Sequence, residues 1–144
     1  MLNKQEIEII RQFNRKYTNT LGLLNKRVFN TELSFPEARV LMSITNGSTP
    51  MEIADKLHLD ASYTSRIIKK LTKLNFIKKD VSVKDARSKK LSLTDSGIDL
   101  LDKINSDSDI QIKNLIEDLS SPQQQELYQA FETINNILFE IDGE

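Results

Sequence analysis

The 144-residue chain has no cysteine or tryptophan, one histidine, four glycines and three prolines. The lack of cysteine excludes disulfide bonds, thiolate metal sites and thiol redox switches, and it fits a reducing compartment. Few glycines and prolines, with 38% hydrophobic residues, argue against disorder and favour one domain of ordinary size. Residues 1–10 lack the apolar run of a signal peptide, and no segment is apolar enough to cross a bilayer. We expect a cytoplasmic protein.

The net charge of −1 conceals a strong separation of charge along the chain. Residues 61–90 contain ten basic and two acidic side chains, whereas residues 91–144 contain two basic and twelve acidic ones. A local excess of lysine and arginine is typical of a surface that binds a polyanion such as nucleic acid. A solvated basic surface that binds no ligand explains this distribution of charge equally well. The sequence motifs are therefore needed to distinguish the two explanations.

Hydrophobic residues recur at steps of three or four over most of residues 3–28 and again after residue 94. This spacing predicts amphipathic helices at both ends of the chain. Ser34 and Thr49 are each followed by a proline within two positions and by a glutamate three positions later. Ser121 is followed directly by Pro122. These patterns are typical of helix N-termini. Asp60 is predicted to cap another helix that ends near Asn75.

After residue 75 the hydrophobic period changes to two, and residues 76–81 and 89–93 read as strands joined by a polar loop. A helix, a helix-turn-helix and a two-stranded wing in this order define a winged helix. We therefore predict a mainly α single domain, residues 1–144, with a small β-hairpin wing. The winged helix-turn-helix DNA-binding lobe is expected over about residues 34–94, and long N- and C-terminal dimerisation helices over about residues 3–30 and 95–142.

The second helix of the helix-turn-helix is the one that Asp60 is predicted to cap. We expect it to enter the major groove of DNA, which is wide enough for a helix. Its residues offer hydroxyls, an aromatic face and a guanidinium for base edges, and ammonium groups for phosphates. The predicted contact residues of this helix are Ser62, Tyr63, Thr64, Ser65, Arg66, Lys69 and Lys70. A helical hairpin with a solvated polar face is the plainer alternative.

The hairpin carries a second basic cluster, in which Lys84, Arg87 and Lys89 are predicted to contact DNA. An arginine at a hairpin tip can enter a narrow minor groove, where the negative potential is enhanced. Asp85 lies two residues before Arg87 and could orient its guanidinium. The alternative is an exposed hairpin with a local ion pair of little energetic consequence.

Several segments together resemble the MarR family of bacterial regulators. They are LSFPEARVL (33–41), TPMEIADKL (49–57), DASYTSR (60–66), DAR (85–87) and LSLTDSG (91–97). The resemblance spans residues 5–140 and implies a homodimer, built by the N- and C-terminal helices, that binds a pseudo-palindromic operator and usually represses. By motif match it places Ser62, Tyr63, Ser65 and Arg66 in the major groove, and Arg87 in the minor groove with Asp85 supporting it.

The sequence departs from the family pattern in the hairpin region. Asn75 stands where many members have glycine, and Lys78 and Lys79 stand where many have arginine. Asparagine tolerates the turn, whereas lysine loses the bidentate fork of arginine toward phosphate. Residues 13–17 with 33–41 also resemble the regulator half of MarR–acetyltransferase fusions, although the chain contains no acetyltransferase segment.

Many members bind small aromatic acids or other apolar anions between the dimer helices and the DNA-binding lobe. That resemblance makes Phe13, Tyr17 and Arg39 the effector residues to test, with core packing and a surface ion pair as the plainer reading. No cofactor, metal or catalytic site is predicted: His58 is a lone histidine, and no phosphate-binding loop or nucleophile with its base is present.

The sequence thus predicts a sequence-specific double-stranded DNA-binding regulator, a repressor released by a small-molecule effector, and not an enzyme. A protein-interaction module that uses the winged helix as a scaffold is the alternative, because a fold does not fix a function.

Overall fold

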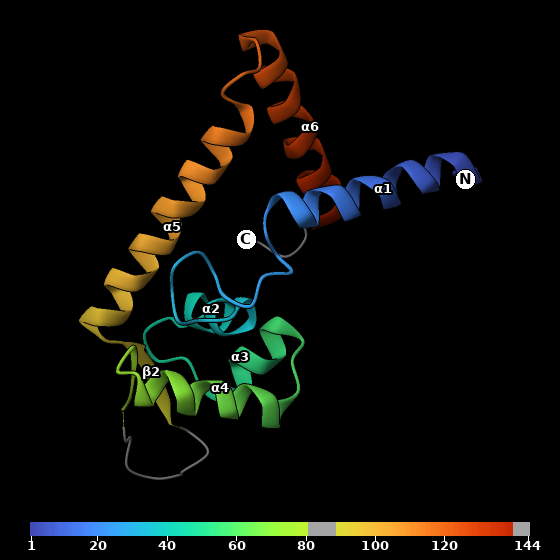
Figure 1. Cartoon of the computed structure of the whole chain (residues 1–144). Helices are drawn as coiled ribbons and strands as arrows, with labels where there is room; N and C mark the ends of the chain where they lie inside the picture. The colour runs from blue at the N-terminus through green and yellow to red at the C-terminus, as the bar shows by residue number, and fades with distance from the viewer. Residues whose placement is uncertain (81–88, 140–144) are drawn as a thin grey trace. The chain divides into compact units, whose positions relative to one another are not determined.

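The computed structural model describes residues 1–80 and 89–139. Within them lie α1 (Lys4–Thr20), α2 (Phe35–Met42), α3 (Pro50–Leu57), α4 (Ala61–Lys73), β1 (Ile77–Asp80), β2 (Lys90–Leu93), α5 (Asp95–Ile116) and α6 (Ser121–Phe139). The chain divides into two compact units, Met1–Asp107 and Ser108–Glu144. The predicted mainly helical fold with a small β-hairpin is confirmed (Figure 1).

The helix starts follow the predicted capping residues. The Ser34 hydroxyl accepts a hydrogen bond from the Glu37 N–H, while the Ser34 N–H donates to the Glu37 carboxylate, which completes a capping box on α2. Thr49 and Asp60 accept from the third residue of α3 and of α4 in the same way. These bonds satisfy amide groups that the first helical turn leaves without partners.

The predicted cap of α6 is wrong by one residue. Ser120, not Ser121, accepts the Gln123 N–H at 3.3 Å, and its own N–H donates to the Gln123 side chain at 3.2 Å. Ser121 is the first helical residue, which places Pro122 in the first turn, where its missing N–H costs nothing.

The predicted N-terminal helix is present, but it is shorter than the hydrophobic spacing up to residue 28 suggests, because α1 ends at Thr20. Gly22 adopts a left-handed backbone with φ of 68°, which a right-handed helix cannot continue through. The following segment folds into the first unit instead, where Val28 and Leu33 are 3% and 0% exposed and the Val28 N–H donates to the Leu33 carbonyl. Burial of these two side chains therefore overrides the helical spacing.

The winged lobe is built on one hydrophobic core. Side chains from α2, α3, α4 and both strands are buried together, among them Val40, Leu41, Ile53, Leu71 and Leu91. In Figure 1 these elements lie side by side at the lower end of the view. The lobe thus holds α4 rigidly by its inner face and leaves the opposite face to solvent.

The hairpin is a two-stranded antiparallel sheet in the described residues, with Ile77 opposite Leu93 and Lys79 opposite Leu91. Its free edge is covered by the loop after α2, since the Gly47 N–H donates to the Leu91 carbonyl and the Leu91 N–H donates to Ser48. The sequence does not predict this pairing of the loop after α2 with β2. It anchors the base of the wing to the lobe.

A compact junction joins the end of α4 to the start of α5. Asn75 has a φ of 66°, as its left-handed preference predicts, and its carbonyl accepts the Thr94 hydroxyl at 2.6 Å. Thr94 also accepts the Gly97 N–H at 3.0 Å and donates its own N–H to the Phe76 carbonyl. Through these bonds, the direction in which the hairpin leaves α4 is fixed by the first turn of α5.

Candidate nucleic-acid interface

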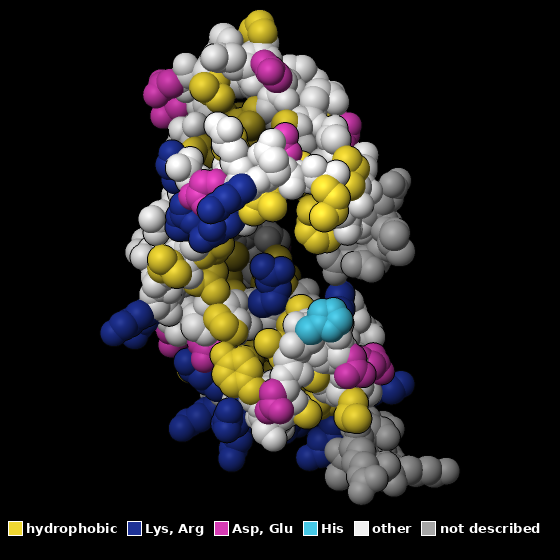
Figure 2. Space-filling model, turned by 90° about the vertical axis from the view of Figure 1, so that its right-hand side faces the viewer, with side chains coloured by type: hydrophobic (Ala, Val, Ile, Leu, Met, Phe, Trp, Pro, Cys, Tyr) yellow, Lys and Arg dark blue, Asp and Glu magenta, His cyan; other side chains and the backbone are white. Residues whose placement is uncertain are grey.

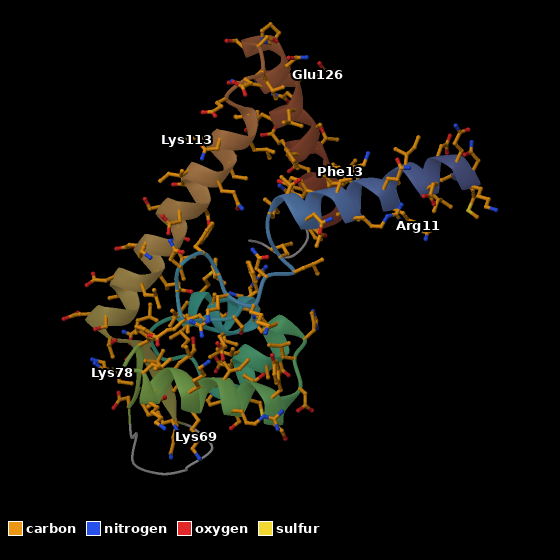
Figure 3. The ribbon with its side chains drawn as sticks, viewed as in Figure 1. Arg11, Phe13, Lys69, Lys78, Lys113 and Glu126 are labelled. Carbon is orange, nitrogen blue, oxygen red and sulfur yellow. The ribbon has the colours of Figure 1, made fainter. Side chains whose placement is uncertain are left out.

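Helix α4, the candidate recognition helix, has one buried and one exposed face. Ile67, Ile68 and Leu71 are buried in the lobe. The residues on the opposite face are exposed and recur at helical spacing: Ser62, Ser65, Arg66, Lys69 and Lys73. Figure 3 shows the Lys69 side chain projecting from α4 on the side away from α2. The structure therefore brings most of the predicted groove-contacting residues of α4 onto one accessible surface, which we call the outer face.

Arg66 is held near Tyr63 on this helix. The guanidinium carbon lies 5.9 Å from the centre of the Tyr63 ring, within the range of a cation–π contact. The Tyr63 ring is itself half-buried against the core. One side of Arg66 thus rests on an anchored aromatic ring, which restricts the positions its charged end can reach.

The prediction that Thr64 contacts DNA is wrong. Its side chain is 1% exposed, and its hydroxyl donates to the Asp60 carbonyl at 2.9 Å. Thr64 therefore belongs to the inner face of α4. The spacing could have shown this, because Thr64 lies three, four and seven residues before Ile67, Ile68 and Leu71.

Lys70 has a partner that the sequence did not indicate. Its ammonium group lies 3.0 Å and 2.8 Å from the two carboxylate oxygens of Glu37 in the first turn of α2. Burial on its own would raise the Glu37 pKa, but the hydrogen bonds and charge of Lys70 and the Ser34 N–H lower that pKa below its ordinary value. Lys70 is thus already engaged within the protein.

The hairpin adds basic residues at the edge of α4. Lys78 and Lys79 on β1 and Lys90 on β2 are exposed, and Lys89 is half-buried just before β2. Figure 2 shows lysine and arginine side chains gathered at the lower end of the molecule, at the level of α4. The predicted wing residues Lys84, Asp85 and Arg87 lie outside the described residues, so their contacts with DNA stay predictions.

The predicted effector residues are only partly brought together. Phe13 and Tyr17 stack within α1, with ring centres 5.0 Å apart and planes inclined by 18°. Arg39 lies on the exposed side of α2 in the winged lobe. An effector site formed by these three residues stays a prediction.

Residues 1–80 and 89–139 contain no cluster of three or more histidine or acidic side chains arranged to hold a metal ion. Among them, no helix combines the length and the apolar character that a membrane span requires.

The lobe's topology and the exposed basic face of α4 define the chain as a winged-helix protein. Residues 24–104, more than half of the chain, match the family described as transcriptional regulator SarA/Rot, and the chain belongs to that family. This is a family of regulators and not of enzymes. The chain is also similar to YfiV, an HTH-type transcriptional regulator of Bacillus subtilis, with 27% identity over 109 residues that cover 74% of this chain and 68% of YfiV.

Solved structures, several of them MarR proteins, share the fold, which confirms the predicted resemblance. Streptococcus pneumoniae FabT, solved in complex with DNA, superposes with a TM-score of 0.73 at 15% identity, covering 94% of this chain and 98% of FabT. Staphylococcus aureus MarR, solved with salicylate and kanamycin, gives a TM-score of 0.69 at 21% identity, covering 95% of this chain and 92% of that one. The chain is thus a transcriptional regulator of the SarA/Rot family, with a winged-helix fold that it shares with solved MarR structures.

Proposed function

We propose that the protein is a dimeric regulator that binds a pseudo-palindromic double-stranded DNA operator in the bacterial cytoplasm. The observation that carries this proposal is the outer face of α4. Hydroxyls and a guanidinium occupy its N-terminal half and ammonium groups its C-terminal half, all opposite a fully packed inner face. Short polar groups suit base edges in the major groove, and lysines suit the flanking phosphates.

A dimer is supported by apolar surface that the single chain leaves open. Within the described residues, neither α1 nor α6 contributes a buried side chain. On α1, Ile7, Ile10 and Phe13 are 46%, 49% and 47% exposed; on α6, Ile134 and Leu138 are 47% and 63% exposed. Apolar faces of this extent mark association surfaces, and two copies give the two-fold symmetry that a palindromic operator requires.

We further infer that the protein represses transcription and is released by a small aromatic or anionic effector. The stacked pair of Phe13 and Tyr17 offers an aromatic surface, and the structurally similar Staphylococcus aureus MarR was solved with salicylate. Titration of salicylate into the protein–operator complex tests this part. We expect operator release in the wild type and a weaker response when Phe13 is replaced by alanine.

Arg66→Ala tests the DNA-reading surface. If Arg66 contacts a base, its loss weakens binding to the operator by about 1–3 kcal/mol and weakens binding to random duplex less. The measurement is fluorescence anisotropy with labelled duplexes from the gene's own upstream region and of scrambled sequence. Arg27→Ala is the matched control, because Arg27 is an exposed arginine that is not part of α4.

Two results would count against the proposal. The first is that Arg66→Ala weakens binding to the operator and to the scrambled duplex equally, which would mean that Arg66 contacts a phosphate and not a base. The second is no binding of the wild type to either duplex at low salt, which leaves the protein-interaction module as the better reading.

A further inference from the structure

Glu37 and Lys70 form an ion pair that joins two elements 33 residues apart in the sequence. Glu37 lies in the first turn of α2, and Lys70 lies in the second half of α4. The side chain of Glu37 is 14% exposed and that of Lys70 is 48% exposed. The pair therefore lies at the edge of the lobe, beside the surface that we assign to DNA.

The Glu37 carboxylate is fixed by two partners at once. One of its oxygens accepts the Ser34 N–H at 2.9 Å and the Lys70 ammonium at 3.0 Å, while the other oxygen accepts Lys70 at 2.8 Å. The N-terminal end of α2 also favours a negative charge at this position. Because the capping box holds the carboxylate at the start of α2, Lys70 has to give up its two hydrogen bonds to Glu37 in order to extend outward toward a DNA phosphate.

Helical geometry separates Lys70 from the other lysines of α4. Lys69 and Lys73 are spaced four residues apart and continue the outer face. Lys70 falls one position further round the helix, on the flank that it shares with the half-buried Tyr63 seven residues earlier. A phosphate backbone that follows the outer face meets Lys69 and Lys73 before it meets Lys70.

Electrostatics favour keeping the pair intact when DNA approaches. If Lys70 turned to a phosphate, Glu37 would keep a poorly hydrated negative charge without its partner, next to a polyanion. Removing one partner of a partly buried pair costs more than an exposed pair contributes. By the same argument, the role of Lys70 is to neutralise the Glu37 carboxylate at the edge of the DNA-binding surface.

We propose that Lys70 is a positioning residue which locks α4 to α2 and masks Glu37, and that Glu37 thereby restricts phosphate contacts on α4 to Lys69 and Lys73. This inference rests on the proposed DNA-binding function. It replaces the sequence-based expectation that Lys69 and Lys70 are equivalent phosphate contacts.

The salt dependence of DNA binding distinguishes the two roles, because each phosphate contact contributes about 0.9 to the slope of log K against log salt. Three variants are compared on one duplex: Lys69→Gln, Lys70→Gln and Glu37→Gln. We expect Lys69→Gln to reduce the slope by about 0.9, and Lys70→Gln to lower affinity with a much smaller change of slope. Glu37→Gln keeps a side-chain oxygen for the Ser34 N–H, frees Lys70, and should raise the slope by about 0.9.

The inference is overturned if Lys69→Gln and Lys70→Gln reduce the slope equally and Glu37→Gln leaves it unchanged. That result would make Lys70 an ordinary phosphate contact and would leave the proposed DNA-binding function intact. Absence of binding by the wild-type protein would instead refute the function and this inference together. Thermal unfolding of each variant confirms that the lobe is folded, and Lys103→Gln on α5 serves as an exposed lysine control.

Discussion

At the residue scale, Gly97 is a position with little tolerance for a larger side chain. A Cβ atom built there would lie 2.1 Å from the carbonyl oxygen of Phe76. The same oxygen accepts the Thr94 N–H, and the Gly97 N–H donates to the Thr94 hydroxyl, so the backbone on both sides is fixed. The glycine that ends the LSLTDSG segment (91–97) therefore has a packing role at the junction of the hairpin and α5.

Gly97→Ala should destabilise the protein by about 1–3 kcal/mol or more, because the new methyl group can be accommodated only by moving backbone. The free energy of unfolding in urea measures this effect. Ser96→Ala, an exposed neighbour in the same turn, is the control and should stay within about 0.5 kcal/mol of the wild type. Equal stability of the two variants would contradict the close approach.

Single residues also show how far sequence reasoning reaches. The exposure of Ser62, Ser65, Arg66 and Lys69 follows from the spacing of apolar residues on α4, which is a local property. The prediction for Thr64 is wrong because its position among the buried residues of α4, and not the polarity of its side chain, decides which face it lies on. The partner of Lys70 lies 33 residues away on another helix, and no local pattern encodes such a contact.

At the scale of elements, local patterns predict the starts of α2, α3 and α4, whereas the end of α1 depends on tertiary packing. A capping residue and its amide partner lie three positions apart, so Ser34, Thr49 and Asp60 were recognisable in the sequence. The end of α1 depends on Gly22 and on the burial of Val28 and Leu33, which tertiary packing decides. For the same reason the pairing of Gly47 and Ser48 with β2 was missed.

The attachment of α2 to α4 should depend on pH through Glu37. Its pKa is lowered in the folded protein, so its contribution to stability is present above the ordinary value of 4.5 and is lost as the pH falls through the lowered value. We expect the wild type to be more stable than Glu37→Gln at neutral pH, with the difference shrinking below pH 4.5. Chemical denaturation of both proteins across this range measures the difference. A constant difference would show that the Glu37–Lys70 pair does not stabilise the fold.

At the scale of the whole molecule, the apolar faces of α1 and α6 are the features that one chain cannot explain. Leu127, Phe131, Ile134 and Leu138 recur on α6 at the alternating steps of three and four that suit helix–helix packing. A dimer would bury these faces and hold two copies of α4 at a fixed separation. The sequence predicts this arrangement through its helical periodicity, whereas the spacing between the two recognition helices depends on the assembled dimer.

The most direct test of the central claim is selection of bound duplexes from a random DNA pool by the wild-type protein. A dimer that places one α4 in each of two successive major grooves should enrich a pseudo-palindrome with half-sites about 10–10.5 base pairs apart. Ile134→Glu, which introduces a charge into the apolar face of α6, should lose the two-fold symmetry of the selected sites and most of the affinity. No enriched sequence, or a single half-site selected equally by both proteins, would contradict dimeric recognition of DNA.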